Sequence, residues 1–328
     1  MRAAKVAESC DNVTCYYVGD GPPMFVQSSQ FDMFALSVLK KDRLQKVIRS
    51  LDPITDIFQV HTRPNHLVEW VREATDKPVV WDCHDLFGLF DKSVVHEESI
   101  AAKSCNGIVS VNSYLAHAAF TAVNYPKESD LKFPVSYYRT MLPKGWFPRL
   151  EDPEENHIII PTGLSMTPGH FRYWYEVFKK IHALGIKLHV YSSQYKPVPE
   201  YVDIGIDCHG ATPLVYLLGA ITKAEAGLCG FPIENNLTKI ASPNKFYEYI
   251  GCGIPIICYG EGLMADEVRE KNLGVVVKEA EEIPEALKKI RKEKIRNHIR
   301  EIRFQYSMET QIERLMKFYH EVISCGGS

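Results

Sequence analysis

The sequence has 328 residues, and at about 100–200 residues per domain this predicts two domains or one large domain. Hydrophobic residues make up 45% and charged residues 24%, which excludes a disordered chain, a collagen and a disulfide-stabilised miniprotein. The formal net charge of -3 gives no overall positive field of the kind that drives nucleic-acid binding. No apolar run approaches the roughly 18 residues of a membrane span, and the first ten residues lack the apolar core of a signal peptide. We therefore expect a soluble, folded α/β protein.

In the first half of the chain, short apolar runs alternate with amphipathic helical stretches. Strands are predicted at residues 12–18, 54–61, 77–83 and 107–111, and helices at 34–50, 64–74, 94–105 and 113–123. Largely apolar strands that alternate with helices indicate a parallel sheet covered on both faces.

The alternation is interrupted at residues 124–156, which are rich in Pro, Lys, Asp and Glu and are predicted to link two domains, 1–145 and 146–306. A second series then begins. Strands are predicted at 157–161, 187–191, 226–229, 254–258 and 274–277, with a further apolar segment at 202–208. Helices are predicted at 171–184, from Pro213, and at 243–250 and 262–271. Two doubly wound domains are the simplest architecture.

The tail, residues 283–323, is predicted to be helical and strongly basic. Residues 287–303 contain eight Lys or Arg and two Glu. A solvated helix face is the first interpretation, and a patch that contacts anionic lipid or an acidic acceptor is the alternative.

The nine cysteines are scattered, and no two form a C-x-x-C pair. Several lie in apolar stretches, as buried thiols in a reducing compartment do. We predict no structural disulfide and no zinc site among them.

The segment from residue 242 to 257, SPNKFYEYIGCGIPII, carries the most chemical information. Ser242 is predicted to cap a helix with Pro243 in its first turn, and Gly251 and Gly253 to end it. Lys245 then lies in the first turn, where a cation opposes the helix dipole unless an anion binds there. Glu248 follows on the same face, and together they suit the phosphate and ribose of a nucleoside diphosphate. The alternative is an ordinary ion pair on a surface helix.

This segment resembles the signature of GT-B glycosyltransferases, most closely the retaining group 1 (family 4) type and its capsule and exopolysaccharide relatives. Further resemblances are PVVWDCHDLF to an acceptor-domain strand, IIIPTGLSMTPGHF to the opening of the donor domain, and YSMETQIERLMKFYHEV to the C-terminal helix. The resemblance implies two Rossmann-like doubly wound domains that face a cleft, with helix 307–323 packed back on the N-terminal domain. Relatives open with a strand, whereas this chain opens on the helix-like RAAKVAES, so we expect the first strand of the N-terminal sheet to be absent.

The resemblance also implies roles for individual residues on the donor side. Lys245 would contact the diphosphate and Glu248 the ribose, although the second glutamate common in the family is replaced by Ile240. The other expected donor-binding residues are Gly163, Ser165, His170, Arg172, Ala211, Asn236 and Asn244, and Asn235 and Asn236 lie in a loop where the family often places residues that contact the sugar.

On the acceptor side, the polar residues Asp82, His84 and Asp85 follow the strand 77–83. Ligands of α/β proteins bind at the carboxyl ends of strands, so we expect His84 and Asp85 to be catalytic, with His84 near the transferred sugar or the acceptor proton. The alternative is a structural turn in which Asp85 caps the next segment. His61 is a second candidate.

Together these features predict an enzyme, a metal-independent glycosyltransferase that moves a sugar from a UDP- or GDP-sugar to a hydroxyl of a glycan, lipid or small molecule. No separate cofactor and no nucleic-acid partner is expected. The resemblance places the protein in the cytoplasm in polysaccharide biosynthesis, with peripheral membrane contact open. Two alternatives remain: a nucleotide-sugar epimerase of the same fold, and a non-catalytic nucleotide-sugar-binding protein.

Overall fold

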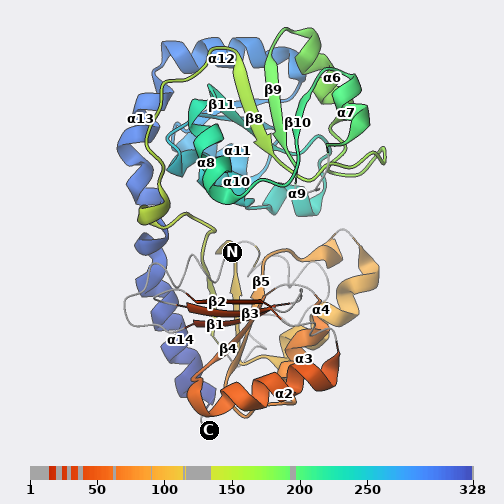
Figure 1. Ribbon diagram of the computed structural model, residues 1–328, viewed down its shortest axis with the longest axis vertical. Coiled ribbons are helices and arrows are strands. Elements are labelled where there is room, and N and C mark those ends of the chain that lie inside the picture. Colours follow the sequence, from red (N-terminus) through yellow and green to blue (C-terminus); the bar gives the residue numbers. More distant parts are fainter. Residues whose placement is uncertain are drawn as a thin grey trace. The chain divides into compact units, whose positions relative to one another are not determined.

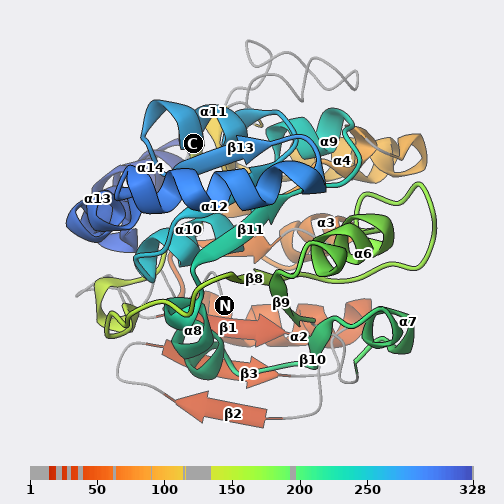
Figure 2. The same cartoon turned by 90° about the horizontal axis from the view of Figure 1, so that it is seen from above.

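The computed structural model describes residues 15–19, 24–27, 31–35, 40–61, 64–89, 91–113, 115, 134–192 and 197–326. Contacts within the chain divide it into two compact units, one of Met1–Thr140 with Met308–Ser328 and one of Met141–Ser307. Figure 1 labels the elements of both units, and Figure 2 shows the same elements from above. Each unit is described by itself.

The main sheet of the first unit has four parallel strands in the order β4-β5-β6-β7. The strands are β4 (Phe58–His61), β5 (Val79–Cys83), β6 (Gly107–Ser110) and β7 (Val135–Tyr137). The helices are α2 (Lys41–Leu51), α3 (His66–Arg72), α4 (Val95–Ser104) and α14 (Ile312–Gly326). β5 and β6 are buried along their whole length, and α14 packs Leu315, Phe318 and Val322 against Val80 and Val109 of these strands.

β7 corrects the sequence interpretation, because it lies inside the segment predicted as a linker. Its residues pair with β6 from Ile108↔Val135 to Ser110↔Tyr137, so the first sheet continues to Tyr137. The strand was missed because it is short and is surrounded by proline and charged residues, while its pairing partner lies far back in the sequence.

The N-terminal strands form a separate sheet in the order β1-β3-β2. β1 (Cys15–Gly19) runs parallel to β3 (Phe31–Ala35), and β2 (Met24–Gln27) runs antiparallel to it. The strand predicted at 12–18 overlaps β1, but the helix predicted from residue 34 begins only at Lys41, since Phe34 belongs to a strand. The helix-like start, and with it the expected absence of a first strand, lies outside the described residues, as does most of the helix predicted at 113–123.

The second unit contains a six-stranded parallel sheet in the order β10-β9-β8-β11-β12-β13. Its strands are β8 (His157–Pro161), β9 (Lys187–Tyr191), β10 (Asp207–His209), β11 (Ala226–Gly230), β12 (Ile256–Tyr259) and β13 (Gly274–Val277). Numbered along the chain, the order is 3-2-1-4-5-6, that of a dinucleotide-binding Rossmann fold. β8, β11 and β12 are buried on both faces, which confirms a covered, doubly wound sheet.

Helices connect these strands, and two of them, α7 and α9, were not predicted from the sequence. They are α6 (Tyr175–Ala183), α7 (Pro199–Asp203), α8 (Leu214–Lys223), α9 (Asn236–Ile240), α10 (Asn244–Gly251), α11 (Leu263–Glu270), α12 (Ile283–Lys292) and α13 (Ile295–Ile302). Short 3₁₀ segments lie at Asp52–Ile54, Phe87–Leu89, Lys92–Val94, Lys144–Trp146, Ala280–Glu282, Arg303–Tyr306 and Met308–Gln311. No helix in the described part of the chain is both long and apolar enough to cross a bilayer.

The basic segment of the tail, residues 287–303, divides by residue type, which corrects the interpretation of a solvated helix face. All four of its arginines bind other parts of the second unit: Arg291 the buried Glu225 carboxylate, Arg296 the Ala224 and Glu225 carbonyls, Arg300 the Glu151 carbonyl, and Arg303 the Gly251 carbonyl. Its four lysines, Lys288, Lys289, Lys292 and Lys294, are exposed. A guanidinium offers several donors in a planar fork, which suits it to a carboxylate and to paired carbonyls.

Five of the described cysteines are buried free thiols. They are Cys83, Cys105, Cys229, Cys252 and Cys258. Burial raises the pKa of Cys105 to about 12 and that of Cys229 to about 11, so both stay protonated at neutral pH.

Candidate functional site

The switch point of the second sheet, where the strand order reverses, lies between β8 and β11. Ligands of open α/β sheets bind outside the carboxyl ends of the strands at this point. The loop that follows β8 doubles back there, because the Ser165 amide donates to the Arg172 carbonyl over 3.1 Å and the Arg172 amide donates to His170 Nδ1 over 3.0 Å. A Cβ on Gly163 would lie 3.0 Å from Arg172 Nη1, so the glycine leaves the guanidinium room beside the strand end.

Helix α10 is held against the switch point by Tyr249. The Tyr249 hydroxyl lies 3.1 Å from the Ile159 carbonyl oxygen on β8 and 2.9 Å from that of Leu228 on β11. Its ring covers Gly227, where an added Cβ would come within 2.5 Å of ring atoms. Close packing of the helix on β11 therefore requires glycine at this position.

The end of α10 confirms the glycine signal, but its start differs from the prediction. Gly253 has a φ of +71°, its amide donates to the Ile250 carbonyl, and the Ile254 amide donates to the Tyr249 carbonyl, which is a Schellman motif. At the other end Pro243 is the N-cap, and the Ser242 hydroxyl lies 2.9 Å from the Tyr247 hydroxyl. The predicted Ser242 cap is wrong, because this serine bonds to a side chain one turn further on.

Lys245 and Glu248, one turn apart on α10, are both buried, with 8% and 5% of their surface exposed. The alternative of an ion pair on a surface helix therefore does not describe them. Burial is the main reason that the pKa of Lys245 falls to about 8, and the positive charge of Arg172 lowers it further, whereas Glu248 acts in the opposite direction. A cation and a carboxylate thus share a desolvated region at the switch point, and the exposed Arg172 is near enough for its charge to act on Lys245, an arrangement suited to an anionic ligand with hydroxyl groups.

The other expected donor-side residues lie at the ends of neighbouring elements. Ala211 is exposed in the loop after β10, and Asn244 is exposed at the first position of α10. Asn236 is exposed at the start of α9, a short helix that the sequence analysis did not predict. Its signal was the capping box, in which Asn235 Oδ1 accepts from the Thr238 amide and Thr238 Oγ1 accepts from the Asn235 amide.

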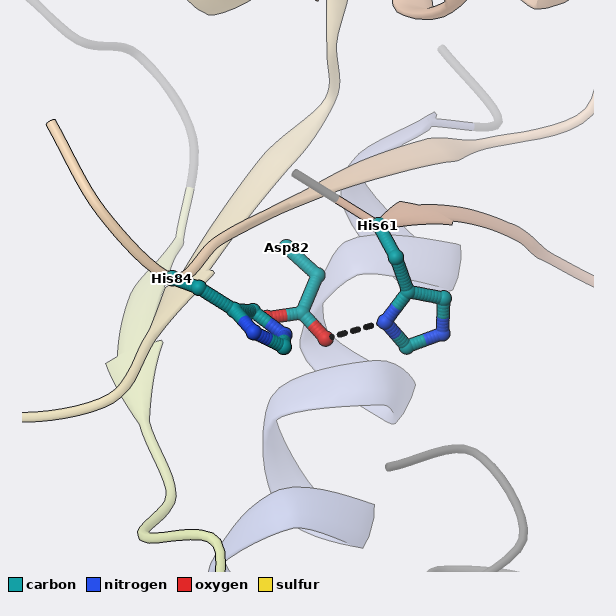
Figure 3. Close-up of side chains that lie close together, drawn as sticks. All are labelled: His61, Asp82 and His84. Atoms are coloured by element: carbon teal, nitrogen blue, oxygen red, sulfur yellow. Dashed lines mark ion pairs between the residues drawn. The ribbon is translucent and has the colours of Figure 1, made fainter. Parts of the chain in front are cut away.

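In the first unit, a buried carboxylate connects the two candidate histidines. Figure 3 shows the Asp82 carboxylate between the imidazole rings of His61 and His84. Asp82 Oδ2 lies 2.8 Å from His61 Nδ1, and Asp82 Oδ1 lies 3.4 Å from His84 Nε2. Asp82 is fully buried, while the two histidine side chains are 24% and 28% exposed, so the rings face outward from a fixed anion. Asp85 follows, half-buried, beyond the end of β5.

Further donors hold Asp82 in place. Asp82 Oδ2 accepts hydrogen bonds from Gln59 Nε2 over 2.7 Å and from the Tyr138 hydroxyl over 2.9 Å, and the Tyr319 hydroxyl of α14 donates to Gln59 Oε1. Asp82 thus orients His61 and His84, a role that the sequence analysis did not assign to it. The signal was present in the spacing, since residues i and i+2 of a strand share a face and parallel pairing places His61 opposite Asp82.

With this geometry in view, the chain can be compared with known proteins. Residues 179–311 match the family described as glucosyltransferase 3-like, C-terminal domain. No curated protein sequence matches the chain.

Solved structures resemble almost the entire chain. Sucrose-phosphate synthase from Thermosynechococcus elongatus aligns with a TM-score of 0.68 and 14% identity over 97% of this chain and 92% of its own. HepE from Anabaena, in complex with UDP and glucose, aligns with a TM-score of 0.64 and 10% identity over 93% and 98%. The E. coli structure described as trehalose-6-phosphate bound with UDP-2-fluoro glucose aligns with a TM-score of 0.62 and 11% identity over 97% and 94%. The protein therefore has the GT-B fold of these glycosyltransferases, and its residues 179–311 match a glucosyltransferase-like domain.

Proposed function

We propose that the protein is a glycosyltransferase that moves a sugar from a nucleoside diphosphate donor to a hydroxyl group of a glycan, lipid or small-molecule acceptor. The observation that carries the proposal is the buried pair of Lys245 and Glu248 at the switch point, with the charge of Arg172 in reach. The match to a glucosyltransferase-like domain supports this proposal. The UDP and UDP-sugars bound to HepE and to the E. coli protein favour a UDP-sugar as the first donor to test.

On the donor side, cleavage of the bond between the sugar and the diphosphate requires that the negative charge of the departing diphosphate be stabilised. Lys245 and Arg172, together with the N-terminus of α10, would offset that charge in place of a metal ion. Glu248 would accept hydrogen bonds from the ribose hydroxyls. The backbone at Gly163 and Ser165 would approach the phosphates, and Ala211 the base, while His170, Asn236 and Asn244 would complete the donor site.

On the acceptor side, His84 would contact the transferred sugar or accept the proton of the attacking hydroxyl, with Asp85 beside it. The orientation of His84 would come from Asp82, whose carboxylate lies 3.4 Å from its ring. Retention at the sugar and an acceptor that belongs to polysaccharide assembly follow from the sequence resemblance, which covers nearly the whole chain.

Binding measurements with paired ligands test the donor assignment. Calorimetry of Lys245→Ala should show UDP bound about ten- to a hundredfold more weakly and uridine almost unchanged, because a charge-assisted bond to phosphate is worth roughly 1.5–3 kcal/mol. Glu248→Ala should weaken both ligands alike. Equal losses of UDP and uridine in Lys245→Ala would refute the phosphate role. The same comparison of guanosine with GDP tests the other candidate donor nucleotide.

The epimerase alternative differs in its need for an acceptor. An epimerase converts a nucleotide-sugar by itself, whereas a transferase leaves the sugar unchanged until an acceptor hydroxyl is present. Incubation with UDP-glucose alone, followed by sugar analysis, separates the two: a new nucleotide-sugar would favour the epimerase, which the family match does not favour.

A further inference from the structure

Three strands at one edge of the second sheet carry a row of imidazoles that the proposed donor chemistry does not use. Asp207 and His209 lie two residues apart on β10 and therefore share a face, and the register pairs Asp207 with His189 on β9. His157 of β8 lies diagonally opposite, with its ring 4.4 Å from that of His189.

The polar atoms of His189, His209 and Asp207 converge. His189 Nδ1 lies 2.9 Å from His209 Nε2 and 3.4 Å from Asp207 Oδ2, and His209 Nε2 lies 3.7 Å from Asp207 Oδ1. Three ligand atoms at about 2.0–2.2 Å from one ion lie about 3–4 Å from each other, so these separations suit a shared metal ion. The three ligand atoms all lie within 4.8 Å of one another.

The cluster of His61, Asp82 and His84 in the first unit differs from the cluster of His189, Asp207 and His209 in how its polar atoms are arranged. That cluster also combines a D-x-H pair with a histidine paired across the strand, but it is organised around a buried carboxylate. The ring centroids of His61 and His84 are 6.0 Å apart, and Asp82 Oδ2 already accepts from three donors. In the second unit the two imidazole nitrogens themselves meet in a hydrogen bond, which a shared ion would replace, and the Asp207 side chain is 52% exposed and open to an ion from solvent.

The surroundings keep the rings in place. Tyr191 stacks on His209 with ring centroids 4.3 Å apart and an interplanar angle of 13°. Two imidazoles and one carboxylate form a ligand set typical of zinc and other late first-row divalent metals.

We propose that His189 Nδ1, His209 Nε2 and a carboxylate oxygen of Asp207 bind one divalent transition-metal ion, with water in its remaining coordination positions. The site lies on β9 and β10, contains no cysteine and no residue assigned to the donor or acceptor, and stands independently of the proposed glycosyl transfer.

Titration with Co²⁺, followed by its absorption spectrum, and with Zn²⁺ by calorimetry tests the site in the full-length protein. We expect one equivalent of either ion to bind to the wild type. His209→Ala should weaken binding by more than the about 10–100-fold typical of losing a residue that only supports a ligand, and Asp207→Asn should weaken it and alter the Co²⁺ spectrum. His320→Ala, which removes an exposed imidazole from α14, is the matched control and should bind as the wild type does.

Each other outcome overturns the proposal. Absence of stoichiometric binding to the folded wild type rejects the site, as does unchanged binding by His209→Ala and Asp207→Asn. Loss of binding in His61→Ala, with His209→Ala unaffected, would assign the ion to the first unit instead. Far-UV circular dichroism and urea unfolding without metal establish that each variant is folded. Asp207 is exposed enough for its isosteric replacement to leave the fold intact.

Discussion

Lys245 is a buried cation, and its replacement by methionine should make the ligand-free protein more stable while damaging its binding site. Burial lowers the pKa of Lys245 from 10.5 to about 8 in the folded chain. The unfolded chain therefore binds the proton more tightly than the folded chain does between about pH 8 and 10.5. The free energy of unfolding should rise with pH across this window, and below pH 8 the full cost of the buried charge remains.

The size of this cost follows from the two pKa values. At about 1.4 kcal/mol per pKa unit, the difference between 10.5 and about 8 corresponds to about 3 kcal/mol at pH 7. Methionine has a similar length and no charge, so Lys245→Met should raise the free energy of unfolding by about 1–3 kcal/mol, with repacking accounting for the smaller values. The same variant should gain almost nothing from UDP, whereas the wild type should be stabilised in proportion to UDP saturation.

Urea unfolding of the wild type and of Lys245→Met, at pH 7 and pH 9.5 and with and without UDP, measures the effects of the substitution, of pH and of UDP on the free energy of unfolding. Lys289→Met, which replaces an exposed lysine of α12, is the matched control and should change neither stability nor UDP stabilisation. UDP should also bind the wild type less tightly above pH 8, as Lys245 loses its proton. A loss of stability in Lys245→Met at pH 7, or a wild-type stability that is no higher at pH 9.5 than at pH 7, would refute the reasoning.

Three further predictions concern catalysis and packing. His84→Ala should lower kcat more than about tenfold with little change in donor affinity, and unimpaired turnover in steady-state assays would remove the catalytic assignment. In Gly227→Val, the new Cβ would lie 2.5 Å from the Tyr249 ring of α10, so the variant should lose about 1–3 kcal/mol of unfolding free energy and bind UDP more weakly. A urea midpoint equal to that of the wild type would contradict this prediction. Arg291→Ala leaves the buried Glu225 without its guanidinium and should cost about 1–3 kcal/mol by thermal unfolding, whereas Lys292→Ala should stay within about 0.5 kcal/mol; equal effects would show that the pairing contributes nothing.

The sequence predicts the second unit best, because its central strands β8, β11 and β12 are buried on both faces and all its longer strands read as short apolar runs between helical patterns. The predicted strands 187–191 and 274–277 agree with β9 and β13 at both ends. Long-range pairing explains the failures: β7 is formed by three residues in a charged segment, and Phe31–Ala35 joins β1 and β2 although its apolar residues continue into a helical pattern. In both cases the partner strand, and not the local sequence, decides the conformation.

The candidate site could be predicted by residue type but not by environment. Helix signals placed Lys245 and Glu248 one turn apart, yet their burial depends on how α10 packs against β11, which no local pattern contains. Similarly, the D-x-H spacing at Asp82 and His84 was visible in the sequence, but the fourth participant, Gln59, and its link to α14 depend on strand register and on a helix more than two hundred residues away.

The division of labour between arginine and lysine in the basic tail bears on how this surface can evolve. The arginines of residues 287–303 are tied to carbonyls and a carboxylate of the second unit, while the lysines end in solvent. Substitution of these arginines should therefore affect folding, whereas substitution of the exposed lysines should affect it little. Single substitutions of these lysines can therefore remove or invert the charge of this surface at little cost to the fold, so the surface charge can change in evolution without loss of stability.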